Sequence, residues 1–190
     1  MSSRAVRIAD PVELPVSRDE FKGHMSIDFD DDDALLDMYL QAATDHLDGL
    51  SGLLGRCMVT QTWRVSFSDW ADAVELPLPD VSDAVLTYVD TDGEQATVAD
   101  SLYSVVATSD GTRIQYADEF TRPSVISDLA YPIAIDLTAG YGLAISVPSA
   151  LKVAVMAQAA RLYHERLTGG DGREIAAVRD LIAPYRWHRI

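Results

Sequence analysis

The chain has 190 residues, of which 48% are hydrophobic and 24% charged, and its formal net charge at pH 7 is −15. This length fits one compact domain or two small ones, and the hydrophobic share is too high for a disordered protein. No run approaches the roughly 20 apolar residues of a membrane-spanning helix. The first ten residues lack the apolar core of a secretory signal. Cys57 is the one cysteine, so no internal disulfide forms and we expect synthesis in a reducing cytoplasm.

The acidic charge is unevenly distributed along the chain. Residues 1–55 contain 4 basic and 12 acidic residues, residues 57–148 contain 3 and 14, and residues 149–190 contain 7 and 4. DNA affinity depends largely on Lys and Arg that neutralise phosphates, so an acidic body argues against a DNA-binding protein. The basic C-terminal end suits either an acidic protein surface or plain solvation.

Two helices are predicted in the first third of the chain. Ser17 and Glu20 have the spacing of a capping box, which predicts a short helix over residues 18–25. Asp30 is the predicted N-cap of a long helix, because carboxylates are favoured in a first turn. Gly55 is its predicted end. Apolar residues recur along this helix in steps of three and four, at Leu36, Leu40, Ala43, Leu47, Leu50 and Leu54.

The middle of the chain changes to an alternating, β-branched and aromatic pattern that is typical of strands. Asp92-Gly93 and Asp110-Gly111 are turn signals between pairs of these segments. We therefore expect a small antiparallel sheet or barrel. The predicted strands are Val59–Phe67, Val74–Leu78, Ala84–Val89, Ser104–Ala107, Arg113–Tyr116 and Ile133–Thr138.

A second long helix is predicted from Ser149 to about Leu167, followed by a last helix from Glu174 to about Ala183 that Pro184 ends. The long helix has one apolar stripe at Leu151, Val155, Ala159 and Leu162. A second stripe comprises Val153, Met156, Ala160, Tyr163 and Leu167. A helix that is apolar on two faces must be covered on both, either by its own domain or by a neighbouring subunit, and our hypothesis is that the second stripe is a subunit interface.

Together these elements predict an α+β protein in which the N- and C-terminal helices form a bundle and the antiparallel sheet or barrel is inserted between them. The expected domains are a helical domain of residues 1–56 and 148–184, a β-rich domain of residues 57–147 and a tail of residues 185–190.

Sites for chemistry are not apparent in the sequence. Counting an EF-hand from Asp28 places Asp33 where glycine is required and Tyr39 where glutamate is required, so helix capping explains the acidic run better. No phosphate loop, dinucleotide fingerprint or nucleophile elbow occurs, and no His lies at metal-ligand spacing from another His or from Cys57. We predict no catalytic residue, no metal and no cofactor.

Several short motifs follow one another along the chain in a recognisable order. They are Asp31-Asp-Asp-Ala-Leu-Leu36, Ala42-Ala-Thr-Asp-His46, Leu54-Gly-Arg56, Thr60-Gln-Thr-Trp-Arg64, Leu137-Thr-Ala-Gly-Tyr-Gly142, Val147-Pro148 and Leu181-Ile-Ala-Pro-Tyr-Arg186. Their order and spacing resemble those of the head–tail connector (adaptor) proteins of tailed phages and gene transfer agents. The similarity extends over nearly the whole chain, apart from residues 110–131 and the end after Arg186.

This resemblance implies a structural protein of a virion or phage-like particle, made in the host cytoplasm. It implies a homo-oligomeric ring, commonly of twelve copies, that joins the portal protein to stopper or tail proteins while DNA passes without sequence-specific contact. No membrane is involved. The C-terminal segment is the implied portal-docking element, and its aromatic and arginine side chains are types that dominate interfaces. Its residues are Tyr185, Arg186, Trp187, Arg189 and Ile190.

Two alternatives remain open at this stage. A small hydrolase would use carboxylates of the β-rich domain as acid and base, and it predicts a concave pocket with a perturbed pair. A monomeric binding module would recognise a ligand or peptide at a sheet edge, and it predicts a monomer without exposed apolar patches.

Overall fold

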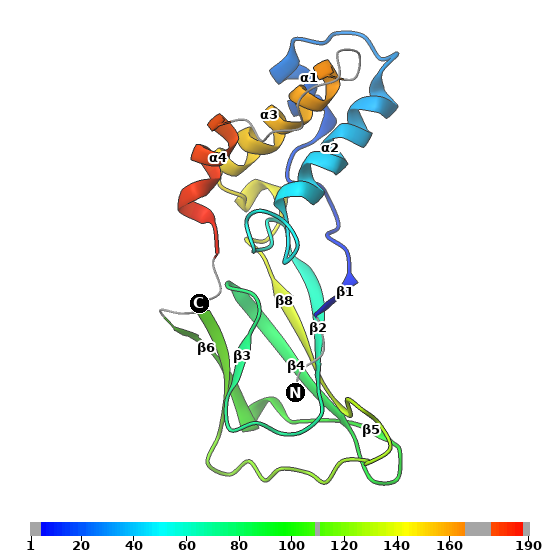
Figure 1. Ribbon diagram of the computed structural model, residues 1–190, viewed down its shortest axis with the longest axis vertical. Coiled ribbons are helices and arrows are strands. Elements are labelled where there is room, and N and C mark those ends of the chain that lie inside the picture. Colours follow the sequence, from blue (N-terminus) through cyan, green and yellow to red (C-terminus); the bar gives the residue numbers. More distant parts are fainter. Residues whose placement is uncertain (1–4, 109–110, 166–175, 188–190) are drawn as a thin grey trace. The chain divides into compact units, whose positions relative to one another are not determined.

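The computed structural model describes residues 5–108, 111–165 and 176–187, and its elements are shown in Figure 1. These residues divide into two compact units. The helical unit comprises residues 12–59 and 141–187, and the β unit comprises residues 5–11 and 60–140 within the described ranges. The prediction of a mixed α+β protein is confirmed. None of the described helices is long and apolar enough to span a bilayer.

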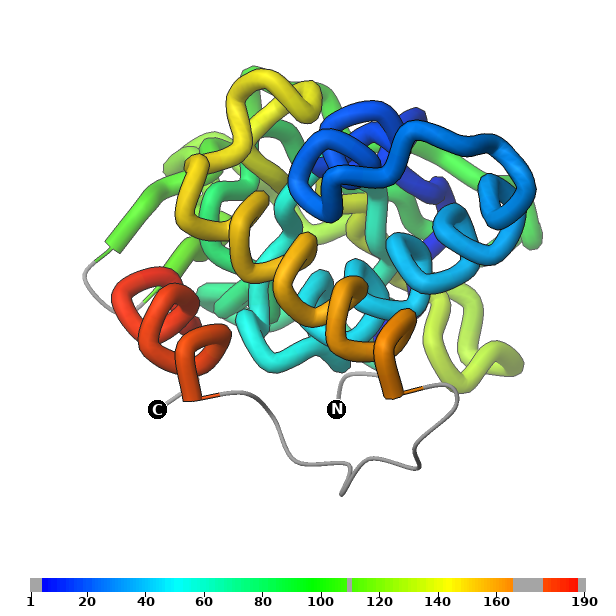
Figure 2. The backbone as a smooth tube through the Cα atoms, turned by 90° about the horizontal axis from the view of Figure 1, so that it is seen from above, coloured from blue at the N-terminus to red at the C-terminus, as the bar shows by residue number. Residues whose placement is uncertain are grey.

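The helical unit contains α1 (Arg18–Met25), α2 (Asp33–Leu47), α3 (Ser149–Glu165) and α4 (Ala176–Ile182). The helix α3 packs against both α2 and α4, and Figure 2 shows it between them. The predicted start of α1 is confirmed, because Ser17 and Glu20 form a reciprocal capping box. The Glu20 N–H donates to Ser17 Oγ over 3.2 Å, and the Ser17 N–H donates to the Glu20 carboxylate over 2.8 Å.

The predicted continuation of α2 to Gly55 is wrong, since the helix ends at Leu47. The Asp48 carboxylate there accepts the Met58 N–H over 2.6 Å, and Gly49 adopts a φ of 74°, so the chain leaves the helix and turns back. Leu54 is nevertheless fully buried in the same core. The apolar spacing therefore identified core residues correctly and the helix end incorrectly.

The core of the helical unit consists of leucine-rich helix faces. It joins residues from the two ends of the chain, so neither half of the unit has a complete core by itself. Fully burying each such side chain contributes roughly 1.5–3 kcal/mol. The fully buried members on the four helices include Phe21, Leu36, Leu40, Leu47, Leu151, Val155, Val178 and Ile182.

The β unit contains two open antiparallel sheets and, over the described residues, no closed barrel. The first has the order β1-β2-β8-β4-β5, and the second has the order β3-β7-β6. The strands β1 and β5 were not predicted. The bounds are β1 (Val6–Ala9), β2 (Gln61–Phe67), β3 (Val74–Leu76), β4 (Val81–Val89), β5 (Gln95–Thr97), β6 (Tyr103–Thr108), β7 (Gly111–Tyr116) and β8 (Ile133–Ala139).

The strand β8 is central in the five-stranded sheet and pairs with β2 and β4. Its side chains alternate between buried and half-buried positions, with Ile133, Ile135 and Leu137 inside. On its other face Asp136 accepts two hydrogen bonds from Arg64 of β2, over 2.6 and 2.7 Å, and this pairing raises the pKa of the arginine.

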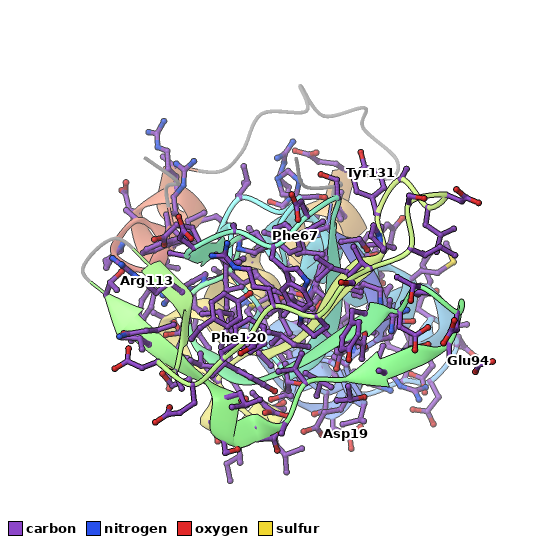
Figure 3. All side chains as sticks on the ribbon, turned by 90° about the horizontal axis from the view of Figure 1, so that it is seen from below. Asp19, Phe67, Glu94, Arg113, Phe120 and Tyr131 are labelled. Carbon is purple, nitrogen blue, oxygen red and sulfur yellow. The ribbon has the colours of Figure 1, made fainter. Side chains whose placement is uncertain are left out.

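A cluster of aromatic rings completes the core of the β unit. The ring of Trp70 lies edge-on to Tyr88, Tyr116 and Phe120, and Figure 3 shows Phe120 within this unit. The Trp70 indole N–H donates to the Pro123 carbonyl over 2.9 Å. Burial raises the pKa of Tyr116. The cluster thus holds the irregular chain after β7 against the strands.

Candidate assembly surfaces

The predicted interface stripe on α3 is only partly available to another subunit. Val153 is 40% exposed. Met156, Ala160 and Tyr163 are half-buried and pack against the core of the helical unit, and Leu167 lies outside the described residues. The second apolar face of α3 is therefore covered largely by its own chain, and contact of this stripe with a neighbouring subunit stays a prediction.

Tyr163 joins the last turns of α3 to the start of α2. Its hydroxyl donates to the Asp32 carboxylate over 2.5 Å, and its ring meets Tyr39 edge-on at a centroid distance of 6.2 Å. A charge at position 163 would therefore disturb the fold of the subunit before it tested any contact between subunits.

The acidic run before α2 is engaged by cations of α1. The Lys22 ammonium lies 2.6 Å from the Asp30 carboxylate and 2.9 Å from that of Asp33, and Arg18 lies 2.6 Å from Asp33. The Lys22 hydrogen bond lowers the pKa of Asp33, and the Asp30 and Asp33 carboxylates raise the pKa of Lys22. Within the described ranges, no three His, Cys, Asp or Glu side chains are grouped so that they could hold a metal.

The first residues of the predicted docking tail bind their own chain. The Trp187 N–H donates to the Leu54 carbonyl over 2.7 Å, and Arg186 Nε donates to the Leu53 carbonyl over 3.1 Å. Tyr185 packs against the helical core. Arg189 and Ile190 lie outside the described residues. The segment from Tyr185 to Trp187 is therefore part of the helical unit in this conformation.

Gly55 provides the space for this tail contact. Its φ is 65°, and a Cβ atom built there would lie 2.6 Å from the Trp187 carbonyl oxygen. Such a distance is too short for any side chain, so the close approach of the two backbones requires glycine. The sequence signal at Gly55, interpreted as a helix end, instead reflects this contact.

Exposed apolar residues that the sequence analysis missed lie in the helical unit. Met38 on α2 is 66% exposed, and Leu143 and Ile145, in the loop after β8, are 57% and 87% exposed. Leu143 and Ile145 line a hollow of about 650 Å³ whose wall also includes Leu14 and Leu40. The loop had no helical or strand periodicity, so only its short apolar run could have drawn attention to it.

Comparisons with known proteins agree with this architecture. The family model described as phage gp6-like head–tail connector protein matches residues 18–106. A chain from the neck of an empty gene transfer agent particle, computed with C6 symmetry, has the same fold, with a TM-score of 0.80 and 24% identity over 99% of this chain and 97% of that one. Comparison with curated proteins gave no match.

Two further structures are similar at higher identity. A chain from the virion of a native gene transfer agent particle has a TM-score of 0.79 and 25% identity over 99% of this chain and 97% of that one. A chain from the neck of a native particle, computed with C12 symmetry, has a TM-score of 0.73 and 26% identity over 96% and 97%. By the family model and these likenesses, the chain resembles the head–tail connector proteins of phages and gene transfer agents.

Proposed function

We propose that this protein is a structural subunit of a twelve-copy ring in the neck of a virion or phage-like particle. The supporting observation is the likeness, over nearly the full length of both chains, to a protein from a particle neck with C12 symmetry. In this function the ring joins the portal protein to stopper or tail proteins. The activity is mechanical, and it requires no catalytic residue.

Exposed apolar side chains of the helical unit support an assembly function. Met38, Leu143, Ile145 and Val153 are each at least 40% exposed. Single exposed apolar residues are normal on a protein surface, but Leu143 and Ile145 lie near each other beside a hollow whose lining is partly apolar and partly charged. Contacts between neighbouring subunits would remove these side chains from water.

The tail is the proposed portal-binding element. Its backbone contacts with Leu53 and Leu54 place Tyr185, Arg186 and Trp187 at the base of the segment. In this proposal the three residues anchor the tail, and Arg189 and Ile190 reach the portal protein. The indole N–H of Trp187 is buried and has no acceptor among the described residues, so an acceptor from a partner would satisfy it.

The charge of the β-rich segment suits a channel through which DNA moves. With 3 basic and 14 acidic residues, residues 57–148 cannot neutralise many phosphates. An acidic wall repels the DNA backbone, so the DNA would slide without being held. The proposed function needs no contact with the DNA bases.

The decisive experiment is a measurement of the native mass of the protein, alone and mixed with a candidate portal protein. A ring-sized species in either sample is the expected result. A protein that stays monomeric and does not bind the portal protein would refute the ring function. The monomeric binding module would then be the favoured function.

Two charge variants locate the subunit contact. Val153→Glu changes an exposed residue of α3 and should abolish ring formation while the monomer keeps its stability. The matched control is Ser149→Glu, an exposed position at the start of the same helix, which should assemble normally. Normal assembly of both variants would remove the α3 stripe from the interface.

A further inference from the structure

The β unit has four outer strands, and they differ in how well they are protected against pairing with another chain. Proteins protect such edges by short length, charges, proline and bulges. The strand β5 has three residues and follows Glu94. The strand β3 also has three residues, has Glu75 at its centre and is followed by Pro77. These two edges are protected.

The outer edge of β6 has none of these protections. The strand has six residues, Tyr103-Ser-Val-Val-Ala-Thr108, without charge or proline. It pairs with β7 on one side only, and no backbone hydrogen bond from another described residue reaches its other side. Because alternate residues of an antiparallel strand direct their N–H and C=O groups outward, this edge offers a template for a further strand.

The other outer strand, β1, has the properties of a partner for it. All four residues of β1 are exposed, and Val6 and Ile8 are 59% and 45% exposed. Its one charge, Arg7, is directed to its own unit, where it pairs with Asp10 over 2.9 Å and lies over the Trp63 ring. As the outer strand of its sheet, β1 pairs with β2 on one side only, and the register shift between Arg7 and Ala9 interrupts its regular part.

The two strands lie at opposite sides of the β unit, as Figure 1 shows. In a rotational ring of more than two copies, one patch of each subunit contacts a different patch of the next subunit, so the two patches must lie at different places on the chain. We propose that β6 of one subunit pairs with β1 of the next, so that the sheets of neighbouring subunits continue into each other. This inference rests on the proposed ring function and names the contact that would set the register between neighbouring subunits.

The pairing covers the exposed side chains of β1. Val105 and Val106 are half-buried, and in a paired strand one of them lies on the same face as Val6 and Ile8. Four paired residues are too few for a stable interface of about 800 Å² per partner. The strand contact therefore fixes register, and the helical units supply the remaining area.

Cysteine crosslinking tests this contact in the assembled protein, formed alone or on the portal. The chain with both Ala107→Cys on β6 and Ile8→Cys on β1 is treated with a short bifunctional maleimide. The reagent tolerates an offset of one or two residues, since strand residues are about 3.3 Å apart. The expected result is a ladder of covalent oligomers that ends at the ring size, whereas each single variant gives no ladder and a mixture of the two gives dimers.

The controls separate this contact from others. The unmodified chain should not react, because Cys57 is 1% exposed. A chain with Ala107→Cys and Thr97→Cys, which places the second thiol on exposed β5, should give no ladder. Dimers from Ala107→Cys alone would show that β6 pairs with itself and would overturn the proposal. Rings without a ladder would overturn it while leaving the ring function intact, and the lack of any oligomer would refute both.

Discussion

The sequence specifies the helical unit and the β unit in different ways. In the helical unit, caps and apolar spacing act over three or four residues, as Ser17 and Glu20 do at α1. In the β unit, the strands β2 and β8 join residues such as Arg64 and Asp136 that are 72 positions apart. Local signals therefore determine where helices form, whereas the order of the strands depends on contacts between distant segments.

The two units also differ in how their charges are compensated. Cations of α1 bind the carboxylates before and within α2, and Lys152 of α3 lies 3.2 Å from Glu20. Residues 57–148 contain too few basic residues to pair their 14 carboxylates. Carboxylates thus help to join helices in one unit and mainly set the surface charge of the other.

The largest effect is expected from opening a cavity in either core. Leu151→Ala in α3 and Leu137→Ala in β8 each remove a fully buried side chain, at a cost of about 2–5 kcal/mol. Hydrogen exchange should show lost protection mainly in the unit that contains the substitution. If either variant lost protection equally in both units, the two cores would unfold as one, and the units would not be independent.

A smaller effect is expected where the tail meets the loop before β2. Gly55→Ala should lower the free energy of unfolding by about 2–4 kcal/mol, because it adds a steric clash with the Trp187 carbonyl to the cost of a positive φ. Gly93→Ala is the matched control, since Gly93 has a φ of 84° with open space around it, and should cost only about 1–2 kcal/mol. Equal costs in denaturant unfolding would show that the tail contact contributes nothing.

The capping box of α1 is the next test of local specification. Ser17→Ala removes the side chain that accepts the Glu20 N–H, so the stability of the helical unit should fall by about 1 kcal/mol. Ser51→Ala, at an exposed position of the same unit, should change it by less than about 0.5 kcal/mol. If thermal unfolding did not distinguish the two variants, the cap would not stabilise this unit.

The smallest effect is expected on the stability of the helical unit at acidic pH. The pKa values of Asp33 and Glu20 are lowered in the folded protein, the first chiefly by Lys22 and the second chiefly by the Ser17 N–H. Their stabilisation is therefore complete above the ordinary carboxyl pKa of about 4 and is lost as the pH falls below it toward the folded values.

Asp33→Asn should accordingly flatten the decline in stability of the helical unit below about pH 4, as measured by denaturant unfolding at a series of pH values. Asp31→Asn removes an exposed carboxylate that forms no ion pair with another described residue, and it should retain the steep decline. A decline of the same slope in both variants and the unmodified protein would exclude Asp33 as a source of acid sensitivity.

The sequence predicted the four α-helices and six of the described strands, but not the outer strands β1 and β5. The bounds of α1 were predicted residue for residue, because its cap is a local signal. The strand β5 has only three residues, and β1 is exposed along its whole length, so neither has the alternation of a half-buried strand. Both strands form because β4 and β2 offer them an edge.

The candidate interface was predictable only as a set of apolar residues. The spacing of Val153, Met156 and Tyr163 shows that they share a helix face, but it does not show what covers that face. The structure covers Met156 and Tyr163 with their own chain and leaves Val153 exposed. The contact of Trp187 with Leu54 joins residues 133 positions apart, so no local pattern could have indicated it.

The division of the helical unit between two distant parts of the chain has a consequence for its synthesis on the ribosome. About 100 residues separate the end of α2 at Leu47 from the start of α3 at Ser149. At roughly 5–20 residues per second, α2 waits on the order of 5–20 s with Leu36, Leu40 and Leu47 uncovered, while the strands that follow it are made and can pair. The core faces of α1 and α2 therefore stay uncovered on the nascent chain until α3 emerges, and during this time they can associate with those of other nascent copies.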